Sequence, residues 1–167
     1  MKTNIVLIGM PGVGKSTVGV ILAKIMGLKF IDSDLCIQER EKRLLKDIIA
    51  EEGVDKFIEI EGSVLSSLDA DNSVIATGGS AVYSAEAMEK LKENGVVIYL
   101  KLSLDSLKER LHDIKGRGVV LRDGQTLDDL FLERAPLYER FADITVTEDN
   151  LSPEETVETL KNLLLSY

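Results

Sequence analysis

A glycine-rich motif near the amino terminus most constrains what this chain can fold into. It runs from Gly9 to Thr17, reads G-M-P-G-V-G-K-S-T, and directly follows the apolar run Ile5–Ile8. Helix-forming residues follow it, so the pattern predicts a strand, a phosphate-binding loop and a helix in that order. The alternative, a glycine-rich turn that merely bears an exposed lysine, is disfavoured by this context.

In a loop of this kind, backbone N–H groups turn inward around a phosphate, and the next helix adds the positive end of its dipole. Lys15 is expected to reach the β- and γ-phosphates of a nucleoside triphosphate. Ser16 is expected to ligate the magnesium ion that accompanies it. The predicted nucleotide-binding residues of the motif are Gly12, Val13, Gly14, Lys15, Ser16 and Thr17.

Length and charge narrow the class of protein. The 167 residues suit one well-buried domain, which we predict to span residues 1–167. The net charge of −9, with no lysine- or arginine-rich block, argues against nucleic acid or an anionic membrane and favours a small-molecule partner. A lone cysteine, no signal-like start and no long apolar run predict a cytoplasmic protein. No exposed heptad repeat points to an oligomer, so we expect a monomer.

Five short apolar runs alternate with helical patterns along the chain. This alternation predicts an α/β three-layer sandwich around a five-stranded parallel sheet, with the ligand site at the carboxyl ends of the strands. The predicted strands are residues 4–9, 28–31, 74–76, 96–100 and 144–146. The predicted helices are residues 18–26, 34–43, 44–52, 54–68, 84–94, 103–112, 127–141 and 152–165. Residues 113–124, rich in glycine and arginine, are expected to form a mobile lid, and Pro136 to bend or interrupt its helix.

Two acidic residues follow the second predicted strand. Residues two apart in an extended strand point to the same side, so Asp32 and Asp34 are both expected to face the phosphate loop. Asp32 would then hold magnesium, and Asp34 would contact an acceptor hydroxyl and take its proton. Helix capping by one or both is the alternative. Because the chain has no N-K-x-D guanine-reading motif, a small-molecule kinase is favoured over a switch GTPase.

Several motifs together resemble the shikimate kinase family over essentially the whole chain. They are the phosphate loop, Asp32-Ser33-Asp34, Phe57–Glu61, Ala76–Gly79, the Arg117 loop and Glu133–Tyr138. The resemblance implies a P-loop NTPase fold like that of nucleoside-monophosphate kinases. It also implies ATP and Mg²⁺ as cofactors, and transfer of the γ-phosphate to the 3-hydroxyl of shikimate, a step in aromatic amino acid biosynthesis.

The resemblance also implies roles for single residues. The implied catalytic residues are Lys15, Asp34 and Arg117. The implied substrate-binding residues are Asp34, Gly78, Gly79 and Arg134, with helices from residues 34–68 beside the substrate. Beyond the loop, Arg110 would lie by the adenine and Arg117 over the phosphates, while Ser16 and Asp32 would hold the metal. A solvated surface position is the alternative for each of the three arginines, Arg110, Arg117 and Arg134.

Three positions depart from the family pattern. Ile58 stands where a second carboxylate-binding arginine belongs, Ser80 replaces a glycine, and Gly118 replaces a lid proline. Losing one partner of a buried carboxylate costs roughly 2 to 5 kcal/mol. Either Lys56 or another cation substitutes, or shikimate binds poorly, or the substrate has no carboxylate there.

The chemistry of these residues predicts a kinase of a small hydroxylated metabolite, and the family resemblance implies ATP as the phosphate donor and shikimate as the leading substrate. A related kinase for a different polyol or sugar acid is one alternative. A catalytically inactive nucleotide-binding regulatory module is another, although the presence of Lys15, Asp34 and Arg117 argues against it.

Overall fold

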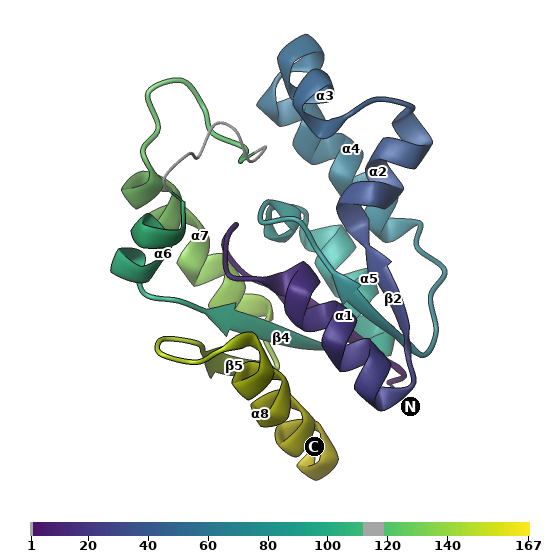
Figure 1. The fold of residues 1–167 in the computed structure, drawn as a ribbon. Helices are drawn as coiled ribbons and strands as arrows, with labels where there is room; N and C mark the ends of the chain where they lie inside the picture. Colours follow the sequence, from purple (N-terminus) through teal and green to yellow (C-terminus); the bar gives the residue numbers. More distant parts are fainter. Residues whose placement is uncertain (1, 112–118) are drawn as a thin grey trace.

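The computed structural model describes residues 2–111 and 119–167 and is built around one parallel sheet (Figure 1). Its strands are β1 (Asn4–Ile8), β2 (Lys29–Asp32), β3 (Ser73–Ala76), β4 (Gly95–Lys101) and β5 (Ile144–Thr147). They lie in the order β2-β3-β1-β4-β5, and every neighbouring pair is parallel. The predicted five-stranded parallel sheet is therefore confirmed.

Helices cover both faces of this sheet. They are α1 (Lys15–Met26), α2 (Ser33–Glu41), α3 (Leu45–Glu52), α4 (Val54–Ser66), the short 3-10 helix η1 (Ala81–Tyr83), α5 (Ala85–Asn94), α6 (Leu104–Arg110), α7 (Leu127–Phe141) and α8 (Pro153–Ser166). Helices α1 and α8 pack together, with α1 against β2 and β3 and α8 against β5, while α5 and α7 pack against β4. Helices α2, α3 and α4 pack together beyond the end of β2, and α6 and α7 lie on the other side of the molecule in this view (Figure 1).

Strand β1 occupies the centre of the sheet because its side chains are apolar on both faces. Between its two neighbours, Val6, Leu7 and Ile8 have no exposed surface. Continuous apolar runs are typical of parallel strands that helices cover on both sides. The loop that follows β1 is thereby placed in the middle of the sheet's carboxyl edge, where neighbouring strands can supply residues to it.

The observed elements begin and end within a few residues of those predicted, with two informative differences. Helix α1 begins at Lys15, three residues earlier than predicted, because the left-handed Gly14 ends the phosphate loop directly at the first helical turn. Helix α7 continues through Pro136, so the prediction that this proline interrupts the helix is wrong. The carbonyl that loses its bond to a proline nitrogen belongs to Leu132, whose side chain is 71% exposed, so water can reach that side of the helix.

The predicted lid is described only in part. Residues 113–118 lie outside the described residues, and residues 119–124 contain a turn but no helix or strand. None of the helices within residues 2–111 and 119–167 combines the length and the apolar character needed to cross a membrane.

Truncating a leucine of α1 should test how far the packing of this helix on the sheet stabilises the fold. Leu22 is fully buried, so Leu22→Ala should lower the free energy of unfolding by about 2 to 5 kcal/mol, measured by urea denaturation. The matched control is Leu132→Ala on exposed α7 surface, expected to change stability by less than about 0.5 kcal/mol. Equal effects of the two substitutions would contradict this account.

Candidate functional site

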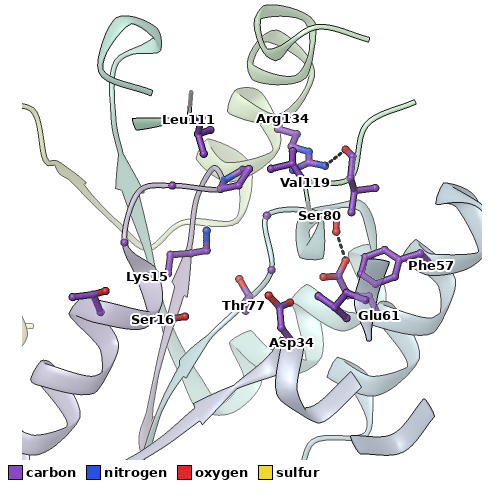
Figure 2. A pocket seen from close by; sticks show the side chains of 18 residues that line it. Lys15, Ser16, Asp34, Phe57, Glu61, Thr77, Ser80, Leu111, Val119 and Arg134 are labelled. Atoms are coloured by element: carbon purple, nitrogen blue, oxygen red, sulfur yellow. Dashed lines mark hydrogen bonds between the residues drawn. The ribbon is translucent and has the colours of Figure 1, made fainter. Parts of the chain in front are cut away.

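A pocket of about 320 Å³ lies at the carboxyl edge of the sheet, between the phosphate loop and the α2–α4 group (Figure 2). Its wall combines the loop with residues that follow β2 and β3 and with side chains from α4 and α7. The lining residues are Pro11, Gly12, Gly14, Lys15, Ser16, Thr17, Asp34, Leu45, Phe57, Glu61, Thr77, Gly78, Gly79, Ser80, Leu111, Val119, Val120 and Arg134. Most of the predicted site residues are thus brought together in one cavity.

The phosphate loop has the backbone geometry that its sequence predicts. Gly12 and Gly14 have φ values of 86° and 89°, in the left-handed region that favours glycine. Val13 lies between them, and its side chain is buried in the hydrophobic core. This packing anchors the loop to the core, while the backbone of Val13 forms part of the loop. The amino-terminal turn of α1, with Ser16 and Thr17, opens directly onto the pocket.

Lys15 crosses the inside of this loop. Its Nζ donates hydrogen bonds to the carbonyl oxygens of Gly9 at 2.8 Å and Met10 at 2.9 Å. Burial lowers the pKa of Lys15 to about 8, and the nearby Asp34 carboxylate acts in the opposite direction. The side chain is therefore a buried cation held by neutral carbonyls beside the space in which phosphates would lie.

Asp32 and Asp34 both reach the loop, but not in the way that the strand pattern predicts. Asp34 is the second residue of α2 rather than part of an extended strand end, so the backbone conformation assumed for Asp34 is wrong, although its side chain does line the pocket beside the loop. Asp32 caps α2, because its Oδ1 accepts from the Asp34 backbone nitrogen at 2.9 Å. Its Oδ2 accepts from the Ser16 hydroxyl at 3.1 Å. The capping alternative is confirmed for Asp32, whose second oxygen still faces the loop.

The Ser16 hydroxyl and the Asp32 carboxylate are oxygen ligands of the kind that Mg²⁺ prefers. Within the described ranges, no group of three or more His, Cys, Asp or Glu side chains could hold a metal ion. A magnesium ion at this point would therefore need further oxygens from phosphates and water, as is usual for nucleotide-bound magnesium. The donor set fits such an ion.

Asp34 lines the pocket across from Lys15. Burial raises the pKa of the Asp34 carboxyl above its ordinary value, the negative charge of Asp32 adds to this effect, and Lys15 opposes it. A carboxylate with a raised pKa is a better proton acceptor than an ordinary aspartate at neutral pH.

Glu61 on α4 is a polar residue of the pocket that the predicted site did not include. It is only 1% exposed, and its Oε1 accepts a hydrogen bond from the Ser80 hydroxyl at 2.6 Å (Figure 2). Burial raises the pKa of Glu61 to about 7. The sequence contains a signal for this position. Glu61 lies at the same helical spacing as the apolar residues Phe57, Ile60 and Val64, which predicts that its side chain points inward with theirs.

Gly78 and Gly79 mark two differently charged faces of the pocket. A side chain at Gly78 would begin 2.5 Å from Glu61 Oε2 and 3.0 Å from Asp34 Oδ1, so both carboxylates occupy the space beside this glycine. A side chain at Gly79 would begin 2.9 Å from Nη1 of Arg134. Figure 2 shows the two carboxylates at the lower side of the pocket and Arg134 at the upper side.

Arg134 is 1% exposed, so the surface alternative is wrong for this arginine. Its Nε donates to the Tyr83 hydroxyl at 3.2 Å, and its Nη2 donates to the backbone oxygen of Val120 at 3.1 Å. The guanidinium also lies over the Tyr83 ring, 5.3 Å from its centroid. These contacts hold the cation rigidly with Nη1 over Gly79.

Arg110 and Ile58 are placed less centrally than Arg134. Arg110 is exposed at the end of α6, where its Nη1 donates to the Gly12 oxygen at 3.4 Å. Arg117 lies outside the described residues. Ile58 lines a neighbouring groove with Tyr83 rather than the pocket, and Lys56 pairs with Glu59 at 3.1 Å on an exposed helix face. Lys56 therefore does not take the place of the missing arginine.

Because Glu61 keeps its proton to higher pH when folded than when unfolded, the folded state binds more protons between about pH 4.5 and 7. Its contribution to stability is thus lost as the pH rises through this window. Glu61→Gln should remove this pH dependence. The free energy of unfolding of the variant, compared with that of wild type at the same pH, should therefore be higher by roughly 2 to 3 kcal/mol at pH 8 than at pH 5. Urea denaturation at both pH values measures this difference, with exposed Glu59→Gln as the control. A pH-independent difference would contradict the assignment.

Comparisons with known proteins agree with this geometry. The shikimate kinase family model matches residues 11–164. The shikimate kinase of Persephonella marina is 36% identical over 155 residues, which cover 92% of this chain and 94% of that protein. The shikimate kinase of Clostridium botulinum strain Eklund 17B is 35% identical over 167 residues, 99% of each chain.

Solved structures show the same relationship in three dimensions. The shikimate kinase from Acinetobacter baumannii in complex with shikimate matches with a TM-score of 0.90 and 33% identity, covering 99% of this chain and 94% of that one. The shikimate kinase from Aquifex aeolicus matches with a TM-score of 0.81 and 35% identity, covering 98% and 95%. The fold predicted from the resemblance is confirmed. The chain belongs to the shikimate kinase family.

Proposed function

We propose that this protein is an ATP-dependent kinase that transfers the γ-phosphate of ATP to the 3-hydroxyl of shikimate, a step in aromatic amino acid biosynthesis. One observation carries the proposal. The phosphate loop, an acidic residue with a raised pKa and a buried arginine line the same 320 Å³ pocket in a chain of the shikimate kinase family. They supply, in that order, a phosphate cradle, a base and a carboxylate-binding cation.

The loop side of the pocket holds Mg-ATP in this proposal. The backbone of Gly12, Val13 and Gly14 surrounds the phosphates, together with the helix turn that carries Ser16 and Thr17. Lys15 exchanges its bonds to loop carbonyls for bonds to phosphate oxygens, which restores the preference of a buried amine for the charged form. Ser16 and Asp32 would hold magnesium, which would supply positive charge to neutralise the phosphates.

The α2–α4 side holds the acceptor. Asp34 accepts the proton of the attacking hydroxyl, whose oxygen forms a bond to the γ-phosphorus as the bond to the β-phosphate oxygen breaks and ADP leaves. Arg134 binds the acceptor carboxylate through Nη1, the guanidinium nitrogen that faces Gly79. Gly78 and Gly79 let the substrate approach the backbone closely.

Two further arginines complete the proposed nucleotide site. Arg110, already bonded to the Gly12 oxygen, lies beside the adenine, and Arg117 in the lid neutralises the phosphoryl group as it moves. Closure of lid residues 113–124 would exclude water from the transfer. We further propose that the protein works as a cytoplasmic monomer on small molecules and binds no nucleic acid.

A second candidate is a kinase of a different polyol or sugar acid. The observation that favours it is that residues 2–111 and 119–167 place no second cation beside Arg134 at the acceptor end: Ile58 lines the neighbouring groove, and Lys56 pairs with Glu59. Turnover of several acceptors under identical conditions separates the two candidates.

Replacing the proposed base tests the mechanism. Asp34→Asn keeps the size of the side chain but removes its ability to take a proton, so kcat with shikimate should fall by about 10²- to 10⁴-fold. The KM for ATP should change little, since the loop is untouched. Coupled detection of ADP formation, with Mg-ATP and shikimate varied separately, gives both constants.

The matched control is Asp69→Asn, an exposed aspartate that precedes β3 at the opposite edge of the sheet. Its kinetic constants should equal those of wild type. The proposed role would be contradicted if Asp34→Asn retained wild-type kcat. ADP formation that is independent of shikimate in wild type would instead contradict shikimate as the acceptor.

A further inference from the structure

Arg134 carries a buried positive charge that neutral groups hold in place. Among the residues that the structure describes, its hydrogen bonds go to the Tyr83 hydroxyl, 3.2 Å from Nε, and to the Val120 backbone oxygen, 3.1 Å from Nη2. The remaining terminal nitrogen, Nη1, faces Gly79 at the pocket. Because neither acceptor is an anion, the charge of Arg134 stays available for a ligand carboxylate.

The Tyr83 hydroxyl has its hydrogen directed by its two partners. The Nε–H group of an arginine can only donate, so the hydroxyl oxygen must accept from Arg134. The hydrogen of the hydroxyl is then left for Glu133, whose Oε1 lies 2.6 Å from the Tyr83 oxygen. Glu133 therefore keeps the hydroxyl from turning its hydrogen toward the guanidinium.

Glu133 is itself held by the chain that leads into α7. Gln125 Nε2 donates to Glu133 Oε2 at 3.0 Å, and Arg122 Nη1 lies 3.7 Å from Glu133 Oε1. Arg122 also donates through Nη2 to Asp55 Oδ1 on α4, at 2.8 Å. These ion pairs lie at the surface, where each contributes little to stability. An effect on orientation can therefore be separated from an effect on folding.

The orientation of Arg134 matters because this cation has no second one beside it among the described residues. Ile58 lines the neighbouring groove together with Tyr83, and it brings no charge to the acceptor end. A hydrogen bond between a guanidinium and a carboxylate is directional, so a rotated guanidinium loses much of its strength. The aromatic ring of Tyr83 lies under the guanidinium, 5.3 Å from its central carbon, and the hydroxyl limits its rotation.

We propose that Tyr83 and Glu133 are positioning residues of the acceptor site, which together orient the guanidinium of Arg134 so that Nη1 meets the acceptor carboxylate. Neither of the two residues touches the acceptor: Tyr83 lines the neighbouring groove, and Glu133 is exposed. The inference rests on the proposed function, since it concerns the binding of the same acceptor. Its effect is confined to the carboxylate end of the pocket.

Tyr83→Phe tests the role of the hydroxyl, because phenylalanine keeps the ring under the guanidinium. The KM for shikimate should rise by about five- to thirtyfold, as expected for the loss of one or two hydrogen bonds. The kcat and the KM for ATP should stay near the wild-type values, since the phosphate loop and Asp34 are untouched. Tyr167→Phe, at an exposed residue far from the pocket, is the matched control and should change none of these constants.

A comparison of shikimate with its carboxamide distinguishes positioning from general damage to the fold. The carboxamide has no negative charge, so it should gain little from a correctly oriented guanidinium. Wild type should prefer shikimate over the carboxamide in kcat/KM, and Tyr83→Phe should reduce this preference by about five- to thirtyfold. A merely structural change would weaken both acceptors alike and leave the preference as it is.

Two substitutions at Glu133 test the other half of the pair. Glu133→Ala should reduce the preference for shikimate, and Glu133→Gln should restore most of it, because an amide oxygen can still accept from Tyr83. Glu139→Ala, which removes an exposed partner of Lys101 on the same helix, is the control and should keep the wild-type preference. The inference is overturned if Tyr83→Phe or Glu133→Ala leaves the preference unchanged, or if Glu133→Gln behaves like Glu133→Ala.

Calorimetric binding of both acceptors in the presence of a non-hydrolysable ATP analogue separates this inference from the proposed function. If neither acceptor is phosphorylated but shikimate binds more tightly than the carboxamide and loses this advantage in Tyr83→Phe, the proposed function fails and the inference stands. If shikimate is phosphorylated and Tyr83→Phe keeps the advantage, the proposed function stands and the inference fails. Equal binding of the two acceptors to wild type would also overturn the inference.

Discussion

The pairing of β1 with a strand on each side fixes the position of everything in the site. Because β3 and β4 hold β1 in parallel register, the phosphate loop emerges at the centre of the carboxyl edge. Thr77, directly after β3, reinforces this placement by donating both its backbone nitrogen and its hydroxyl to the Leu7 oxygen. The glycines that follow Thr77 are thereby held beside the loop, and the two halves of the pocket share one rigid frame.

Within that frame, the protein keeps four ionisable side chains in or beside a small cavity. Lys15, Glu61 and Arg134 are almost fully buried, and Asp34 is partly so. Burial opposes the charged form of the amine and of both carboxyls, as their shifted pKa values indicate. Groups arranged in this way destabilise the empty protein and gain most when a ligand of complementary charge enters, which is a common compromise between stability and function.

Much of this could be predicted from the sequence, because motif spacing and apolar runs depend on local structure. The phosphate loop, the parallel sheet and the placement of Gly78 and Gly79 follow from such patterns, whereas the placement of Arg134 was implied by the family resemblance. The backbone conformation of Asp34 did not follow from them, because the chain turns into α2 one residue earlier than strand alternation assumed. The state of Glu61 could not be predicted, since it depends on the Ser80 hydroxyl from another element.

Position 58 illustrates why membership of a family and detailed specificity have different physical origins. Fold and reaction type depend on the sheet and the phosphate loop, which tolerate a change on α4. Acceptor choice is a difference between binding free energies, so one altered charge at the pocket wall can change it. With an isoleucine at position 58, in the neighbouring groove, α4 contributes a carboxylate to the pocket and, among its described residues, no cation. We therefore expect the balance of charge at this wall, rather than the topology, to determine which acceptor this chain prefers.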